Sequence, residues 1–211
     1  VQVKFKLAIG IPLSWNYVPS DFFHSWTLLN KHGAEIIRGE SGPIHEMRNA
    51  IVTRSLQLDC THLLFLDADM VYPPDSITRL LAHNVDIVSA LMFKRLPNFE
   101  PILFTGDKYN MTQIDPVPDG LVEVAATGTG CLLINTKVFD AIEPPWFEFG
   151  QNNGKPVGED INFCYNAKDA GFKIYVDTTV RTEHLTMTRV NWNLYEMQKS
   201  MLSGGKKGFT F

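Results

Sequence analysis

The sequence predicts an α/β domain in which helices cover both faces of a mostly parallel central sheet. Strand-like and helix-like segments alternate through the first half of the chain, as they do in parallel α/β proteins. The apolar run His62–Leu66 is short and uninterrupted, which is typical of a buried strand. A length of 211 residues suits one well-buried domain and hardly two independent ones.

In the first half we expect four strands and three helices. They are a strand at 3–11, a helix at 22–29, a strand at 34–37, a helix beginning at Pro43, the strand His62–Leu66, the helix Ser76–Ala82 after an N-capping Asp75, and a strand at 86–91. Proline suits the first turn of a helix, and the apolar positions that follow Pro43 recur at helical spacing: Ile44, Met47, Ile51 and Leu58. This spacing leaves His45, Arg48 and Asn49 off the buried face.

The second half is expected to be less regular, because residues 97–120 are rich in Pro, Asn, Asp and Gly. Its expected elements are strands near 102–104, at 121–126, Cys131–Asn135 and 173–176, and helices at 137–142, 158–170 and 190–202. Gly171 suits the C-cap of the second of these helices. Residues 146–156, which are aromatic and then Asn- and Gly-rich, suggest a mobile loop, and residues 204–211 a flexible tail.

Composition excludes several classes of protein. A net charge of -4 argues against general nucleic-acid binding, which needs a broad basic surface. Cys60, Cys131 and Cys164 are widely spaced and odd in number, so we expect buried free thiols in a reducing compartment. The sequence has neither an apolar run of about 20 residues nor a signal-peptide pattern, so we expect a cytoplasmic protein without a transmembrane segment.

Two carboxylates follow the strand His62–Leu66 directly. Asp67 and Asp69 are hard oxygen ligands separated by one residue, a spacing that suits Mg²⁺ or Mn²⁺ with positions left for phosphate oxygens. The alternative is a turn in which short carboxylates bond to nearby backbone. Because ligands of open α/β sheets bind beyond the carboxyl ends of the strands, the position favours the metal site.

Other candidate groups lie further along the chain. Glu159 and Asp160 stand at an expected helix N-terminus, where Asp160 is either a functional carboxylate or an N-cap. His184 follows the last strand and can ligate a cation as a neutral imidazole, although a lone histidine is more often structural. Lys94 and Arg95 can bring positive charge to phosphates or be a solvated basic pair.

Three segments have both a functional and a structural interpretation. Gly128, Thr129 and Gly130 allow close backbone approach to a ligand or form a tight turn. The aromatic residues at 146–149 suggest a lid over a sugar acceptor, with core packing as the alternative. The last helix has one apolar stripe that we expect to dock on the domain, and it is also a candidate seam for a homodimer or a membrane contact: Val190, Leu194, Met197 and Met201.

Four motifs occur in an informative order. They are the strand ending in Asp67-Ala68-Asp69, the run Gly128-Thr129-Gly130-Cys131, the triplet Gly158-Glu159-Asp160, and Glu183-His184-Leu185. In order and spacing they resemble the motif set of GT-A-fold glycosyltransferases, particularly the family 2-like group. The resemblance extends from Ile9-Gly10-Ile11-Pro12 to His184.

The resemblance implies a role for each position. Asp69 and His184 would hold the cation, and Asp67 would contact the donor or the water of the metal. Asp160, with Glu159 beside it, would be the general base. Residues implied near the nucleotide or the donor sugar are Ile11, Pro12, Arg38, Glu40, Arg48, Asn49, Lys94, Arg95, Gly128, Thr129 and Gly130.

The resemblance also implies an activity. A GT-A enzyme with a smaller mixed acceptor-side part would occupy residues 1–203, with a nucleotide-binding half at 1–95, a donor-sugar and acceptor half at 96–188, and a C-terminal helix at 189–203. It would move a sugar from a nucleoside-diphosphate sugar to an acceptor hydroxyl with the help of Mn²⁺ or Mg²⁺, and the family favours inversion. UDP-glucose is the default donor, a GDP-sugar fits the same chemistry, and the acceptor class stays open.

Rival functions predict other features. A haloacid-dehalogenase-like phosphatase carries its Asp-x-Asp on the first strand, whereas here a βαβ segment precedes it. A nucleotidyltransferase on a similar fold needs a Gly-rich basic N-terminal loop, which residues 11–16 do not provide. A catalytically decayed protein that still binds sugar nucleotides is the non-enzymatic alternative.

Overall fold

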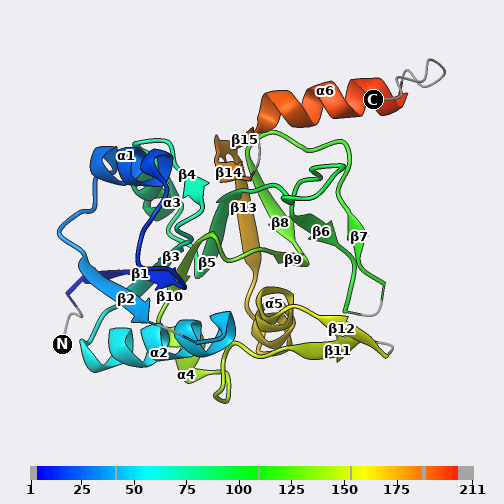
Figure 1. Cartoon of the computed structure of the whole chain (residues 1–211). Helices are drawn as coiled ribbons and strands as arrows, with labels where there is room; N and C mark the ends of the chain where they lie inside the picture. The colour runs from blue at the N-terminus through cyan, green and yellow to red at the C-terminus, as the bar shows by residue number, and fades with distance from the viewer. Residues whose placement is uncertain (1–3, 41, 109, 153, 187–188, 204–211) are drawn as a thin grey trace.

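A seven-stranded sheet runs through the centre of the molecule (Figure 1). The computed structural model describes residues 4–40, 42–108, 110–152, 154–186 and 189–203. In spatial order the strands are β2 (Glu35–Glu40), β1 (Leu7–Leu13), β3 (His62–Leu66), β10 (Cys131–Asn135), β5 (Ile87–Leu91), β13 (Ile174–Arg181) and β8 (Leu121–Val124). Only β10 and β8 run against the others, so the mostly parallel sheet is confirmed.

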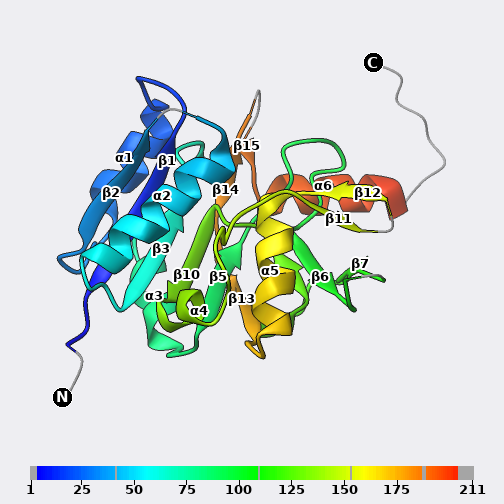
Figure 2. The same cartoon turned by 90° about the horizontal axis from the view of Figure 1, so that it is seen from below.

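Helices cover both faces of this sheet, as Figures 1 and 2 show from two sides. The helices on the two faces are α1 (Ser20–Leu28), α2 (Ile44–Gln57), α3 (Ser76–Ala82), α4 (Lys137–Asp140) and α5 (Glu159–Asp169). Strand side chains alternate between the faces, so Leu63 and Phe65 join the core under α2, α4 and α5, whereas Leu64 and Leu66 join the core under α1 and α3. Two hydrophobic cores therefore hold the sheet in a fixed position.

Three small sheets form the mixed part beside the main sheet. They are β7-β6-β9 (Thr112–Gln113, Leu103–Thr105, Ala126–Thr127), β15-β14-β4 (Arg189–Val190, Glu183–Leu185, Met70–Val71) and β11-β12 (Gly150–Asn152, Lys155–Val157). The segment expected as one strand at 121–126 is thus divided between two sheets. The main sheet takes strands from both expected halves of the chain, because β10, β13 and β8 follow residue 95.

Three expectations near the N-terminus need correction. β1 ends at Leu13 rather than 11, and it tolerates Pro12 because its pairing with β3 stops at Gly10, which leaves one side of the strand free there. Pro43 precedes α2 as its capping residue instead of opening the helix. Arg48, expected off the buried face, is buried, because carboxylates from two other elements meet its guanidinium group.

The segment 146–156 is not simply a loop. Phe147 is fully buried between Phe163, at a centroid distance of 4.7 Å, and Phe65, at 5.3 Å. The hairpin β11-β12 follows it, and within the segment Phe149 stays exposed. Phe147 therefore fits the core interpretation, and its burial contributes about 2 kcal/mol to stability. Phe149 does not belong to the core.

The C-terminal helix α6 (Trp192–Ser203) docks on the domain through only part of its expected stripe, together with two aromatic side chains. Tyr195 packs on Phe93, and Trp192 lies under the guanidinium group of Arg181 at 4.0 Å. Of the expected stripe, Val190 is buried and Leu194 packs against the core, whereas Met197 and Met201 are exposed. Residues 204–211, expected as a tail, lie outside the described residues, and no described helix is both long and apolar enough to cross a bilayer.

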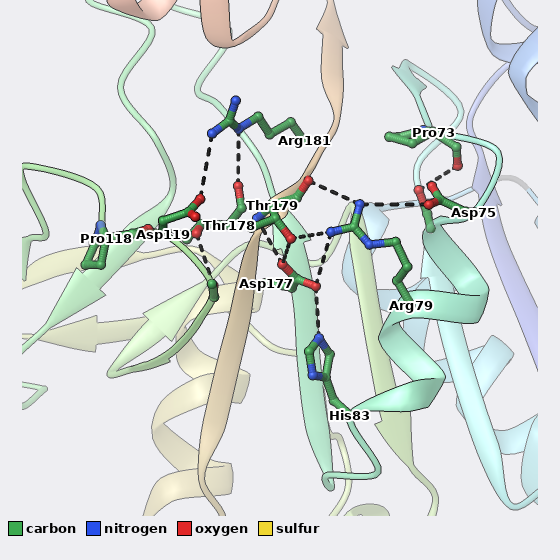
Figure 3. Close-up of polar contacts among 12 residues, drawn as sticks. Pro73, Asp75, Arg79, His83, Pro118, Asp119, Asp177, Thr178, Thr179 and Arg181 are labelled. Carbon is green, nitrogen blue, oxygen red and sulfur yellow. Dashed lines mark hydrogen bonds and ion pairs between the residues drawn. The ribbon is translucent and has the colours of Figure 1, made fainter.

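A buried carboxylate clamps α3 to β13 (Figure 3). Asp177, on β13, accepts hydrogen bonds from His83 at 2.9 Å and from the backbone N–H of Thr179 at 2.9 Å, and Arg79 lies 3.7 Å away. Burial raises the pKa of the Asp177 carboxyl, but the hydrogen bonds from Thr179 and His83 outweigh it, so the pKa lies below its ordinary value. The clamp fixes the strand that leads into β14.

Asp177→Asn is expected to lower the free energy of unfolding by about 1–3 kcal/mol at neutral pH, because His83 and Arg79 lose a charged acceptor. A depressed folded-state pKa stabilises the protein above the ordinary pKa of aspartate, and this contribution is lost as pH falls through the folded value. The difference between wild type and variant should therefore shrink on acidification in urea titrations. Asp119→Asn, at a neighbouring exposed carboxylate, is the control, and equal effects of both changes would contradict the clamp.

Candidate active site

A cavity of about 600 Å³ opens at the carboxyl ends of the parallel strands. Its walls come from the segments that follow β1, β3, β5 and β13, together with the first turn of α2, the loop between β9 and β10, and the start of α5. Open α/β sheets bind ligands at this edge, and the volume suits a small-molecule site. Most of the predicted site residues line it: Pro12, Arg48, Asp67, Asp69, Arg95, Gly128, Thr129, Gly130, Glu159, Asp160 and His184.

Asp67 is held through its backbone. Its N–H donates to the carbonyl of Gly130 at 3.0 Å, and the Tyr72 hydroxyl lies 2.7 Å from the Asp67 carbonyl and 2.8 Å from that of Gly130. Burial raises the pKa of Tyr72 well above its ordinary value, so the hydroxyl keeps the proton that it donates. Tyr72 thus ties the strand end that carries Asp67 to the adjacent loop that leads into β10.

Arg48 joins the two carboxylate clusters. Its guanidinium group lies 3.2 Å from both carboxylate oxygens of Asp67 and also forms an ion pair with Glu159, and its side chain is only 5% exposed. Burial lowers the pKa of Arg48, and the charges of Asp67, Glu159 and Asp160 more than compensate, so the pKa is raised. The arginine therefore stays charged between the strand end and the start of α5, which are 92 positions apart in the chain (Asp67 to Glu159).

Asp69 and His184 meet through strand pairing. β14 pairs with β4, and Leu185 N–H donates to the Asp69 carbonyl at 2.7 Å. This places His184 Nε2 3.6 Å from Asp69 Oδ2. Burial raises the pKa of Asp69, but hydrogen bonding and charge from His184 and the charge of Arg95 outweigh it, so the pKa is lowered and the carboxylate is ionised.

The donor set of Asp69 and His184 fits a divalent cation. His184 Nδ1 is 2.7 Å from the carbonyl of Phe93, which can only accept, so Nδ1 carries a proton, and Nε2 has a lone pair for a cation when it is not protonated. In that form, Nε2 and the Asp69 carboxylate offer two ligand atoms to a cation. Among the described residues no group of three or more His, Cys, Asp or Glu side chains is placed to hold a metal, so the remaining ligands would be water and substrate oxygens.

The loop between β9 and β10 spans the space between the carboxylates. A Cβ on Gly130 would lie 2.5 Å from Met70 Sδ and 3.1 Å from Asp67 Oδ2, so this glycine is required for close packing. A Cβ on Gly128 would lie 3.7 Å from Asp160 Oδ2, which places the other end of the loop beside Asp160. Thr129 Oγ1 is buried in the cavity wall and has no hydrogen-bond partner among the residues that the structure describes, as expected of a group that awaits a ligand.

Asp160 occupies the second position of α5, because Gly158 is the N-cap, so a capping role alone does not account for it. Gly158 leaves room for its carboxylate, since a Cβ there would lie 2.8 Å from Asp160 Oδ1. Burial and the charge of Glu159 raise the pKa of the Asp160 carboxyl, although Arg48 acts in the opposite direction. A carboxylate with a raised pKa in a cavity suits proton transfer.

Comparisons with known proteins agree with this geometry. The family model described as "Glycosyltransferase like family 2" matches residues 32–200. The chain belongs to this glycosyltransferase family. No curated protein matches the chain in sequence.

Three solved structures share the GT-A fold of this glycosyltransferase domain at low identity. A197 from STIV is 18% identical with a TM-score of 0.63, and the match covers 86% of each chain. GalNAc-T7 is 12% identical with a TM-score of 0.55, over 88% of this chain and 45% of that one. TarS 1-349 of S. aureus is 14% identical with a TM-score of 0.52, over 82% and 56%. The GT-A fold implied by the motifs is therefore confirmed.

Several residues that the family motifs implied lie away from the cavity of this glycosyltransferase. Ile11 is buried in the core under α1. Arg38 and Glu40 form an exposed ion pair with each other, and neither lines the cavity. Asn49 holds the backbone of Phe147 through hydrogen bonds of 2.7 and 3.0 Å, so its amide is engaged in structure. Lys94 pairs with Glu100 at 2.7 Å, and Arg95 alone of the basic pair reaches the cavity.

The cavity also contains side chains that the motifs did not indicate. Trp15 and Tyr17, in the segment after β1, line the cavity as an exposed aromatic pair with ring centroids 5.9 Å apart. Such rings stack on planar bases and on sugars. In the sequence, the only indication of this pair was the occurrence of two aromatic residues in a loop that follows a strand. Tyr72 gave no such signal, because only the folded chain brings its hydroxyl to two carbonyl groups.

Proposed function

We propose that this domain transfers a sugar from a nucleoside-diphosphate sugar, with a UDP-sugar favoured, to an acceptor hydroxyl with inversion and with a divalent cation. The observation that carries the proposal is the charge of the cavity wall. Four carboxylates line it, from Asp67, Asp69, Glu159 and Asp160, against the guanidinium groups of Arg48 and Arg95. An excess of two negative charges would repel a diphosphate, so a bound cation is needed to reverse the local charge.

Relatives of the same fold support the donor and the cation. The GalNAc-T7 structure holds UDP, GalNAc and Mn²⁺, and TarS 1-349 was solved with UDP-GlcNAc. The orphan hydroxyl of Thr129 and the close approach at Gly130 suit a polar ligand that reaches the wall between Asp67 and Asp160. UDP-glucose stays the default donor until donors are compared.

In the proposed reaction the residues of this chain have distinct tasks. Asp69 and His184 would hold the cation, which would stabilise the charge that develops on the leaving diphosphate. Asp160 accepts the proton of the acceptor hydroxyl as its oxygen attacks the anomeric carbon. Glu159 acts through Arg48, because their ion pair keeps the guanidinium group against Asp67 and the start of α5 in place.

Isothermal titration with UDP, with and without Mn²⁺, tests the proposal. We expect binding that requires the metal, followed by release of UDP from a UDP-sugar when an acceptor is supplied. Metal-dependent binding of UDP without turnover of any donor would favour the decayed binding protein. No metal-dependent binding of any nucleoside diphosphate would overturn the proposal.

The pH profile of transfer should report Asp160. A general base works only when it is deprotonated. Burial and the charge of Glu159 raise the pKa of Asp160, so the rise of kcat/KM with pH should have its midpoint above pH ~4, the pKa of an ordinary aspartate. Glu159→Gln removes a negative charge that raises this pKa, so the acid limb should move to lower pH. Profiles of kcat/KM for both proteins measure the shift, and a limb that stays in place would contradict the base assignment.

A further inference from the structure

The guanidinium group of Arg95 forms an ion pair with Asp69, the carboxylate that the proposed cation would bind. Arg95 Nη1 lies 2.9 Å from Asp69 Oδ2, the same oxygen that stands 3.6 Å from His184 Nε2. No other ion pair or hydrogen bond of the Arg95 side chain occurs within the described part of the chain. The positive charge of Arg95 thus lies beside Asp69, where the proposed function expects a cation.

The ion pair between Arg95 and Asp69 can break without disturbing the core. The Arg95 side chain is 57% exposed and borders the cavity, so it can leave Asp69 without opening the core. A guanidinium group and a divalent cation compete for Asp69 Oδ2, because their positive charges repel each other at contact distance. The neighbouring Lys94 does not compete, since Glu100 holds it at 2.7 Å.

We propose that Arg95 is a counter-ion that the cation must displace from Asp69, and that the released guanidinium group then binds the donor diphosphate. This inference rests on the proposed function. Guanidinium groups bind phosphate oxygens in bidentate fashion, so the released side chain has a partner only when the nucleotide is present. Metal and nucleotide would therefore bind with positive coupling, and the metal alone would bind weakly.

The consequence has opposite signs for the two ligands. Removing the guanidinium group abolishes the competition, so Mn²⁺ alone should bind about two- to five-fold more tightly, as expected for one exposed ion pair. UDP at saturating Mn²⁺ should bind more weakly, because it loses the arginine. If Arg95 had only a structural role, its removal would not strengthen the binding of Mn²⁺ while weakening the binding of UDP.

The experiment compares Arg95→Gln with the matched control Lys94→Gln in the full chain. Free Mn²⁺ is followed by electron paramagnetic resonance without nucleotide, and UDP binding is measured by calorimetry at saturating Mn²⁺. We expect tighter Mn²⁺ and weaker UDP for Arg95→Gln, and wild-type values for Lys94→Gln. Wild-type protein that binds Mn²⁺ together with UDP, while Arg95→Gln gains no affinity for Mn²⁺ alone, would overturn this inference only. Absence of Mn²⁺ binding in every protein, even with UDP, would overturn the metal-dependent function and the inference together.

Discussion

Asp160→Asn is expected to lower kcat for sugar transfer by about 100- to 10,000-fold while UDP and Mn²⁺ still bind. The amide keeps the size of the carboxyl group but cannot accept the proton of an attacking hydroxyl. The geometry favours Asp160 over Glu159 for this task, because Glu159 is committed to Arg48, whereas the carboxylate of Asp160 faces the cavity with a raised pKa. Steady-state release of UDP measures kcat, and calorimetry measures the binding that should persist.

Asp169→Asn is the matched control for this experiment. It makes the same chemical change on the same helix, at an exposed carboxylate that pairs with Lys108 outside the cavity. Its kcat should equal that of the wild type. Transfer by Asp160→Asn at the wild-type rate would show that another group removes the proton.

Asp69→Ala should weaken Mn²⁺-dependent binding of UDP by about 100-fold, which corresponds to ~2.7 kcal/mol. The variant removes the carboxylate that His184 and Arg95 both face, so the cation loses its only acidic ligand in this pair. Any weak residual binding of UDP without metal should not fall further, since Arg95 is then released to the cavity. Calorimetry with and without Mn²⁺ separates the two effects.

Asp75→Ala serves as the control, because Asp75 lies on the same segment but is exposed and outside the cavity. Its affinity for UDP with Mn²⁺ should match that of the wild type. Equal Mn²⁺-dependent binding by Asp69→Ala and the wild type would remove Asp69 from the metal site. The role of Asp67 would then need to be tested in the same way.

Some site residues could be predicted from the sequence because their signal is local. An uninterrupted apolar strand that ends in Asp67 places this carboxylate at the strand edge wherever the rest of the chain lies. The start of α5 after Gly158 likewise places Asp160 at a helix N-terminus. For Asp69 and His184 the order of motifs was informative, but their 3.6 Å approach depends on the pairing of β4 with β14, two strands too short to be recognised.

Other residues were misplaced because helical spacing describes only the face that a helix presents by itself. Arg48 was expected off the buried face, yet the ion pair with Glu159 buries it, and a buried charge is tolerated only with such a partner. Asn49 was expected at a nucleotide and instead binds the backbone of Phe147, 98 positions away. Neither partner can be inferred from the neighbouring sequence.

By itself the sequence determined the alternation of strands and helices, the carboxylates at the strand end and the order of the motifs, because each follows from short-range pattern. Only the tertiary structure decided which charges meet. Arg48 joins Asp67 to Glu159, Arg95 rather than Lys94 reaches Asp69, and Tyr72 bonds to the carbonyl groups of Asp67 and Gly130. The physical reason is that ion pairs and hydrogen bonds depend on distances of a few ångströms between elements, and the packing of the two cores on the sheet sets those distances.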